Sequence, residues 1–305
     1  MRRMAAVLSI FFFALIVGQL LAGQTGSELV MLGTGMPAAD PDRSGPAVAV
    51  VVNGTAYLVD CGPGIVRRAA AAAQHDHVPA LQASNLKIVF ITHLHSDHTV
   101  GYPDLILSPW VLGRENPLAA YGPVGLQDMT GHILEAWKKD IDVRTRGLEK
   151  KSAPPRVEVH EIQPGVVYRD ANVKVTAFLV RHGSWDQAFG YRFDTPDRSI
   201  VISGDTSPSD SVVKACDGCD LLLHEMYDDS MINAADQHDA PTQKYFAAFH
   251  TSATELARIA SDAHPKLLVL YHQMGVPVDD ARMLNALRTS GYKGPAVSAH
   301  DLDVY

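Results

Sequence analysis

Three histidines and an aspartate, residue types that bind metals, are clustered directly after a short apolar segment of this chain. Residues 87–91 (KIVFI) are typical of a buried strand, and residues 92–98 continue the chain with the sequence THLHSDH. Because side chains alternate along an extended chain, we expect His93 and His95 to point the same way, with the later Asp and His beyond a turn. Neutral imidazoles together with a carboxylate are ligands that suit zinc. The segment therefore predicts a metal centre at the end of a buried strand.

The rest of the chain alternates short apolar runs with segments of helical periodicity. We expect strands over Leu29–Leu32, Val48–Val52, Ala56–Val59, Lys87–Ile91, Val173–Val180, Phe189–Phe193, Ser199–Ile202, Leu221–Leu223 and Leu267–Tyr271. We expect helices over Ile65–Ala73, Leu126–Asp140, Ser211–Cys216, Thr251–Ala263 and Asp279–Thr289. Thr251 or Ser252, followed by Glu255, predicts a capping box at the start of its helix. The pattern indicates an α/β fold whose sheets are covered by helices on their outer faces.

The composition excludes several classes of protein. The chain of 305 residues is 47% hydrophobic and 20% charged, which is ordinary for a globular protein and excludes a disordered or collagen-like chain. It carries 26 Lys and Arg against 34 Asp and Glu, a formal net charge of −8. Because nucleic-acid binding depends largely on Lys and Arg contacts to phosphates, this balance leads us to expect no nucleic-acid partner.

The N-terminus has the pattern of a secretory signal peptide. Met1-Arg2-Arg3 precede the apolar run Ala5–Val17, which has the length of a signal-peptide core and is short for a membrane span. We predict a signal peptide over residues 1–26, a single domain over residues 27–305 and an extracytoplasmic location, either periplasmic or secreted. The alternative is an uncleaved membrane anchor that extends to Ala22.

The three cysteines are compatible with that compartment. Cys216 and Cys219 form either a local disulfide or two plain thiols. Cys61 is expected to be a buried small apolar residue.

Residues 92–98 match the T-H-x-H-x-D-H motif of the metallo-β-lactamase superfamily, and the chain resembles that superfamily in further segments. These segments are Leu32–Gly35, Val59–Gly64, Arg181–Gly183, Phe189–Phe193, Ser203–Thr206 and Tyr271–His272. The resemblance implies a four-layer αβ/βα sandwich, in which two mixed sheets are flanked by helices. It also implies two zinc ions, or another divalent transition metal, bound where several strands end.

The resemblance assigns a ligand to each position of the superfamily's motif. His93, His95 and His182 are expected to hold the first ion, Asp97, His98 and His272 the second, and Asp205 to bridge both. Two dications in such a site lower the pKa of a shared water, which makes hydroxide available near neutral pH. Asp97 is also a candidate for orienting the attacking water.

Two segments resemble the ribonuclease Z branch in particular. They contain Glu225, within Leu223–Glu225, and His250, within His250–Ala253, which the resemblance pairs as a proton shuttle toward the leaving group. Residues 99–107 and the signal peptide resemble secreted arylsulfatases of this fold. We therefore predict a hydrolase of small anionic esters, with aryl sulfates as the leading substrates and Trp185 as a surface for stacking the aryl group.

Alternative functions use the same ligands. They are a phosphodiesterase, a lactonase, a tRNA 3′-endonuclease and a non-catalytic periplasmic zinc-binding protein. We disfavour the tRNA nuclease because only a short connection separates Tyr191–Phe193 from Ser203–Asp205, where such nucleases insert a long arm that clamps tRNA. A homo-oligomer remains possible on the sequence alone.

Overall fold

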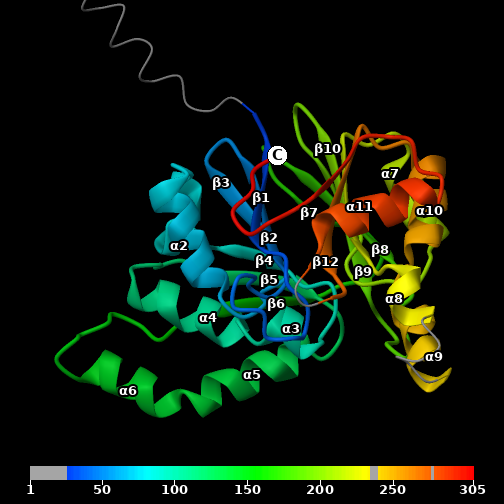
Figure 1. Ribbon diagram of the computed structural model, residues 1–305. Helices are drawn as coiled ribbons and strands as arrows, with labels where there is room; N and C mark the ends of the chain where they lie inside the picture. Colours follow the sequence, from blue (N-terminus) through cyan, green and yellow to red (C-terminus); the bar gives the residue numbers. More distant parts are fainter. Residues whose placement is uncertain (1–25, 234–239, 276–277) are drawn as a thin grey trace, which may run out of the picture.

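Two β-sheets pack face to face between outer helices in the computed structural model, which describes residues 26–233, 240–275 and 278–305 (Figure 1). The first sheet has the order β1-β2-β3-β4-β5-β6 and the second has the order β13-β12-β11-β10-β9-β8-β7. Both sheets are mixed. In the first, the strands from β1 to β3 pair antiparallel and those from β3 to β6 pair parallel. In the second, β7 to β10 are antiparallel and β10 to β13 are parallel.

The strands have the following bounds. The first sheet contains β1 (Glu28–Gly33), β2 (Ala47–Val52), β3 (Thr55–Val59), β4 (Ile88–Phe90), β5 (Leu118–Gly122) and β6 (Val157–Glu161). The second contains β7 (Gly165–Arg169), β8 (Lys174–Leu179), β9 (Phe189–Asp194), β10 (Ser199–Ile202), β11 (Leu221–Met226), β12 (Leu267–Gln273) and β13 (Ala296–Ser298).

The helices fall into two sets, one for each sheet (Figure 1). On the side of the first sheet lie α2 (Ile65–His75), α4 (Tyr102–Val111), α5 (Leu126–Ala136) and α6 (Lys138–Arg146), with the short α3 (Ser96–Thr99). On the side of the second lie α7 (Asp210–Cys216), α8 (Asp229–Asn233), α9 (Ala240–Phe249), α10 (Ala253–Ala263) and α11 (Asp280–Thr289). Among the residues that the structure describes, no helix combines the length and the apolar character needed to cross a bilayer.

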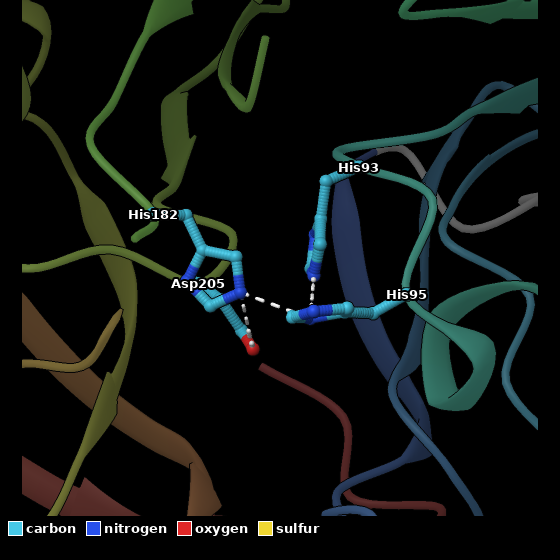
Figure 2. A group of neighbouring side chains, drawn as sticks. All are labelled: His93, His95, His182 and Asp205. Carbon is cyan, nitrogen blue, oxygen red and sulfur yellow. Dashed lines mark hydrogen bonds and ion pairs between the residues drawn. The ribbon is translucent and has the colours of Figure 1, made fainter. Parts of the chain in front are cut away.

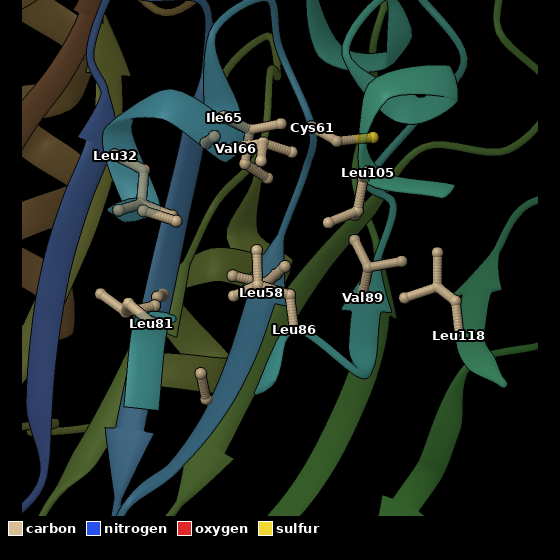
Figure 3. Packing of buried hydrophobic residues seen from close by; sticks show 14 of the residues in the cluster. Leu32, Leu58, Cys61, Ile65, Val66, Leu81, Leu86, Val89, Leu105 and Leu118 are labelled. Atoms are coloured by element: carbon tan, nitrogen blue, oxygen red, sulfur yellow. The ribbon is translucent and has the colours of Figure 1, made fainter. Parts of the chain in front are cut away.

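Successive side chains of a strand pack into the cores on its two faces. In β1, Leu29 and Met31 enter the core between the two sheets, whereas Val30 and Leu32 enter the core between the first sheet and its helices. Figure 3 shows the second of these cores, where Leu58 lies among side chains of β4, β5, α2 and α4. Both faces of β2 are buried, which explains its uninterrupted apolar sequence.

The predicted fold, two mixed sheets flanked by helices, is confirmed. All nine predicted strands are present within a few residues of their predicted bounds, but β5, β6, β7 and β13 were not predicted. The β6 and β7 strands are edge strands with mostly exposed or half-buried side chains, so they lack the buried apolar run of the predicted strands, although β6 (VEVHE) alternates apolar and polar residues, a signal that the sequence analysis missed. The predicted helix Leu126–Asp140 is divided into α5 and α6 at Trp137.

Several smaller predictions have a definite outcome. The Ser252 hydroxyl accepts a hydrogen bond from the Glu255 backbone N–H at 3.3 Å, so Ser252 caps α10. Cys216 and Cys219 form a disulfide, and Cys61 is a buried free thiol. The signal peptide and the possible anchor fall on residues 1–25, which lie outside the described residues, so both remain predictions, as do the domain bounds.

Truncation of Leu58 tests the packing of the inner layers. Leu58 is fully buried, and replacing it with Ala should lower the free energy of unfolding by about 2–5 kcal/mol, because the change removes buried methyl groups and leaves a cavity. The same change at Leu148, which is 98% exposed, should alter it by less than about 0.5 kcal/mol. Urea unfolding followed by circular dichroism measures both, and equal effects would contradict this packing.

Candidate metal centre

Asp60 fixes the start of the metal-binding segment. It follows β3, and its carboxylate accepts hydrogen bonds from the Thr92 backbone N–H at 2.7 Å and the Thr92 hydroxyl at 2.9 Å. The same carboxylate accepts a hydrogen bond from Nδ1 of His98 at 2.8 Å. Both ends of residues 92–98 are therefore tied to one buried carboxylate, which closes the segment into a compact turn.

Four side chains from the two sheets meet in the first ligand group. Figure 2 shows His93 and His95 extending from the segment after β4, while His182 and Asp205 approach from the second sheet. Nδ1 of His95 lies 3.0 Å from Nε2 of His93 and 3.0 Å from Nε2 of His182. Oδ2 of Asp205 lies 3.9 Å from Nε2 of His182. One nitrogen or oxygen of each side chain thus points to a common centre, as in a metal site.

A second group adjoins the first through Asp205. It consists of Asp97, His98 and His272, in which Nε2 of His272 lies 3.2 Å from Oδ2 of Asp97. Asp205 contacts this group as well, with Oδ1 at 3.3 Å from Nε2 of His98 and Oδ2 at 3.5 Å from Nε2 of His272. Asp205 therefore lies between the two groups, the position expected of a bridging ligand.

Hydrogen bonds to the outer ring nitrogens orient three of the histidines. Nδ1 of His182 donates to the Phe249 carbonyl at 2.7 Å, and Nδ1 of His98 donates to Asp60. Nδ1 of His93 lies 2.9 Å from the Thr92 hydroxyl, which itself donates to Asp60 and so can accept from His93. These contacts leave Nε2 of each ring free to bind a metal.

The charges within the centre favour a bound cation. Burial alone would raise the pKa of Asp205, but the neighbouring His272 and His98 outweigh it and hold that pKa well below its usual range. Burial also acts to lower the pKa of His98, but the Asp205 and Asp60 carboxylates raise it well above its usual range. The centre therefore attracts positive charge, which a proton or a metal ion supplies.

The donor set fits divalent metals. Burial holds the pKa of His93 well below its usual range and lowers the pKa of His182 to about 4, so both rings are neutral near pH 7, the form that binds metals. Within the described residues, Nε2 of His98 and Oδ1 of Asp205 are buried and form no hydrogen bond, although they lie 3.3 Å from each other as an ion pair. Buried polar atoms without partners are costly unless something else satisfies them, and a metal ion would satisfy both.

Gly183 allows α9 to pack against the centre. Its φ is 54°, and a Cβ at this position would lie 1.9 Å from the Phe249 ring, so no larger residue fits without displacing that ring. The Gly183 N–H donates to the Ala248 carbonyl at 2.9 Å, beside the bond from His182 to Phe249. The end of α9 is thereby joined to the loop that carries His182.

His272 is held in an uncommon backbone conformation. Its φ is 45°, a region that non-glycine residues rarely adopt, and its backbone N–H donates to the Thr34 carbonyl at 3.0 Å. The Asp301 carboxylate in turn accepts hydrogen bonds from the Thr34 N–H and hydroxyl at 2.9 and 2.8 Å. Such local strain persists only where surrounding contacts hold it, as at many functional sites.

Glu225 and His250 form an ion pair beside the centre. Nδ1 of His250 lies 3.4 Å from Oε1 of Glu225, and that oxygen also accepts the backbone N–H groups of Thr251 at 3.0 Å and Thr206 at 3.3 Å. Burial acts to lower the pKa of His250, but the Glu225 carboxylate outweighs it and raises that pKa. The pair can therefore hold a proton within the site.

The structure brings together every residue that the sequence predicted for the site. The two ligand groups contain the seven predicted metal ligands, and His250 and Glu225 lie next to them. Sequence reasoning missed the role of Asp60, which appeared only within the segment Val59–Gly64, and that of Phe249, whose contribution is a backbone carbonyl. An acidic residue at the end of a predicted strand, followed by glycines, could have indicated a role for Asp60 in the site. No side-chain pattern could have indicated Phe249, because it contributes only its backbone carbonyl.

The sequence of this chain is similar to a known family and to curated proteins over most of its length. The family described as "Beta-lactamase superfamily domain" matches residues 55–273. A Ribonuclease Z of Mycobacterium bovis (strain BCG / Pasteur 1173P2) is 31% identical over 279 residues, which cover 90% of this chain and 96% of that protein. A Ribonuclease Z of Mycobacterium sp. (strain KMS) is 33% identical over 249 residues, covering 81% of this chain and 84% of that protein.

Solved structures agree with these matches. The crystal structure of the short form of human tRNase Z has a TM-score of 0.65 and 26% identity, and the match covers 91% of this chain and 98% of that one. A metallo-β-lactamase fold protein from Bacillus subtilis, at 19% identity, has the same fold with a TM-score of 0.65, covering 92% of this chain and 99% of that one.

These relatives overturn two predictions. The prediction of a secreted arylsulfatase acting on small anionic esters is wrong, because the curated relatives that match almost the whole chain are named Ribonuclease Z. The expectation of no nucleic-acid partner is wrong for the same reason. Net charge is a sum over the whole molecule and does not report the charge at one site, where bound ions can be the largest local charges.

The predicted extracytoplasmic location is neither confirmed nor contradicted. These relatives give no support to the signal, secreted or periplasmic descriptions. The segment that suggested them lies outside the described residues, so the extracytoplasmic location stays a prediction.

Substitution of Gly183 tests the contact between α9 and the centre. Gly183→Ala should lower the free energy of unfolding by about 1–2 kcal/mol for its positive φ and by a further 1–3 kcal/mol or so for overpacking against Phe249. Gly218→Ala is a matched control, because Gly218 also has a positive φ (78°), whereas a methyl group added there would have no other atom within 4 Å. Urea unfolding measures both, and equal losses would contradict the contact.

Proposed function

We propose that this chain, which belongs to the metallo-β-lactamase superfamily, is a metal-dependent hydrolase that cleaves phosphodiester bonds of RNA, with the 3′ ends of precursor tRNA as the leading substrate. One observation carries the proposal: the match to Ribonuclease Z spans 90% of this chain and 96% of the relative. It therefore includes both ligand groups and the Glu225–His250 pair.

The two ligand groups would hold one ion each. His93, His95 and His182 would bind the first, Asp97, His98 and His272 the second, and Asp205 would contact both. When bound, two divalent ions such as Zn²⁺ would neutralise charge on the scissile phosphate and activate the attacking water. The chain's part in this is to hold the donors in place, through the hydrogen bonds that Asp60 accepts from His98, the Thr92 hydroxyl from His93 and the Phe249 carbonyl from His182.

His250 is the group best placed to protonate the leaving oxygen. The Glu225 carboxylate raises the pKa of His250 and lies 3.4 Å from its Nδ1, so Nε2 is the nitrogen that would face the substrate. The leaving group of RNA hydrolysis is a ribose oxygen, a poor leaving group unless it is protonated as the P–O bond breaks. Oε1 of Glu225 accepts two backbone N–H groups, which hold this carboxylate beside the His250 imidazole.

The turn between β9 and β10 bears on how an RNA substrate would be held. β9 and β10 are joined by a tight turn in which the Thr195 N–H donates to the Arg198 carbonyl at 3.0 Å, so no arm is inserted between them. Contacts to RNA must therefore come from other parts of the chain. This favours recognition of the nucleotides next to the cleaved bond.

Removal of Asp205 tests the metal centre. Asp205→Ala should lower the bound metal of the purified protein, measured by elemental analysis, and should reduce cleavage of a precursor tRNA by about 10³-fold, because the variant loses a charged donor shared by both groups. Asp210→Ala, at a side chain that is 76% exposed, is the matched control and should change neither. Full metal content and activity in Asp205→Ala would exclude the proposed centre, and a metal-loaded parent that leaves RNA intact would exclude the RNA substrate.

Replacement of His250 tests the proton donor. His250→Ala should reduce RNA cleavage by about 10²–10⁴-fold, the usual contribution of a general acid. It should reduce hydrolysis of bis(4-nitrophenyl) phosphate far less, because nitrophenolate leaves without being protonated. His132→Ala, at an exposed histidine of α5, controls for loss of an imidazole. An equal loss with both substrates would show that His250 does not act as the acid.

A further inference from the structure

A row of aromatic rings borders the first ligand group. The Trp185 ring packs edge-on against His95 with 5.0 Å between ring centroids. The Phe249 ring lies 6.3 Å from the His95 ring in a nearly parallel orientation, and Tyr245 stacks on Phe249 at 4.6 Å. The rings of Trp185, Phe249 and Tyr245, which we call the aromatic row, therefore lie beside the candidate metal ligands.

These rings are not part of the hydrophobic cores. Tyr245 is 46% exposed, and Trp185 and Phe249 are half-buried. Every residue of α9, which carries Tyr245 and Phe249, is exposed or half-buried. By contrast, core rings such as Phe90 are fully buried. Aromatic surface beside a reaction centre offers a flat apolar contact to a substrate.

The outer nitrogen of His95 makes a different kind of hydrogen bond from the outer nitrogens of the other ligand histidines, because its partner is Trp185. Its indole N–H donates to Nε2 of His95 at 2.9 Å. The outer nitrogens of His93, His98 and His182 instead face groups that accept hydrogen bonds. His95 is therefore the ligand histidine whose outer nitrogen faces a donor.

This bond is incompatible with His95 acting as a ligand through Nδ1. A neutral imidazole that uses Nδ1 as a ligand carries its proton on Nε2. The indole N–H of Trp185 would then face another N–H at 2.9 Å and could not donate to it. When His95 holds a metal, Trp185 must turn away or donate to another acceptor beside the site.

We infer that Trp185, the member of the aromatic row that is hydrogen-bonded to His95, is a substrate-binding residue that stacks on the nucleobase next to the scissile phosphate. Its released indole N–H is then available to an oxygen of the same nucleotide. The inference rests on the proposed function, because an RNA substrate brings a base to this position. Stacking of bases on aromatic side chains does not depend on base identity, which suits a chain that has no inserted arm between β9 and β10.

Binding of nucleotides to the zinc-loaded protein tests the stacking without requiring cleavage. Isothermal titration calorimetry should show AMP binding on the order of tenfold tighter than ribose 5-phosphate, which has the same phosphate and sugar but no base. Trp185→Ala should abolish most of that preference, while Trp185→Phe, which keeps a ring but no N–H, should retain much of it. Trp137→Ala, at a 41% exposed tryptophan between α5 and α6, is the control and should keep the full preference.

Fluorescence tests the effect of the metal on Trp185. The chain has three tryptophans, so the double variant Trp110→Phe, Trp137→Phe reports on Trp185 alone. Adding Zn²⁺ to the chelator-treated protein should shift or change its emission, and AMP should then quench it. Because Trp110 is buried and its replacement can destabilise the fold, the difference in emission between the parent and Trp185→Phe provides the same measurement without that variant.

The outcomes separate this inference from the proposed function. Equal affinities for AMP and ribose 5-phosphate in the parent, or an unchanged preference in Trp185→Ala, would overturn the inference even if RNA is cleaved. A clear preference for AMP that Trp185→Ala removes would support the stacking site even if precursor tRNA proves not to be a substrate. Emission of Trp185 that does not respond to Zn²⁺ would overturn the displacement of its hydrogen bond.

Discussion

The burial of Asp205 is the constraint on which the rest of the site depends. A carboxylate removed from water is stable only where cations or hydrogen-bond donors surround it. Here the surrounding groups are imidazoles from both sheets, including His98, His182 and His272, which lie 3.3 to 3.9 Å from its oxygens. Two sheets that pack face to face, with their ligand-bearing loops on one edge, satisfy that requirement, and the same arrangement creates a centre for cations.

A second layer of contacts makes the centre rigid. Asp60 fixes the loop after β4, the Phe249 carbonyl orients His182, and Thr34 holds His272 in its uncommon backbone conformation. Each of these groups satisfies a polar atom that would otherwise be buried without a partner, so stability and ligand geometry have the same cause. The end of α9 belongs to this layer, which is why the helix that carries Phe249 also brings aromatic side chains beside the ligand histidines.

Function in this superfamily depends on what surrounds the ligands. The fold and the ligand set alone are compatible with several ester substrates, and the resemblance of a few segments to arylsulfatases led to a wrong prediction. Similarity over almost the whole chain, rather than over one segment, corrected it. The net charge of −8 misled in the same way, because it describes the molecule and not the site.

The sequence by itself determined the local features. Strand β4, the clustering of ligands in residues 92–98 and the fold class all follow from spacing along the chain, because side-chain alternation and helix periodicity are local properties. The resemblance had assigned distant residues such as Asp97 and His272 to one ion, but only the tertiary structure gives their contact, since they lie 175 positions apart and touch only when the two sheets pack together. The edge strands, the orientation of each imidazole and the contact of Trp185 with His95 likewise depend on neighbours in space, which no periodicity in the sequence encodes.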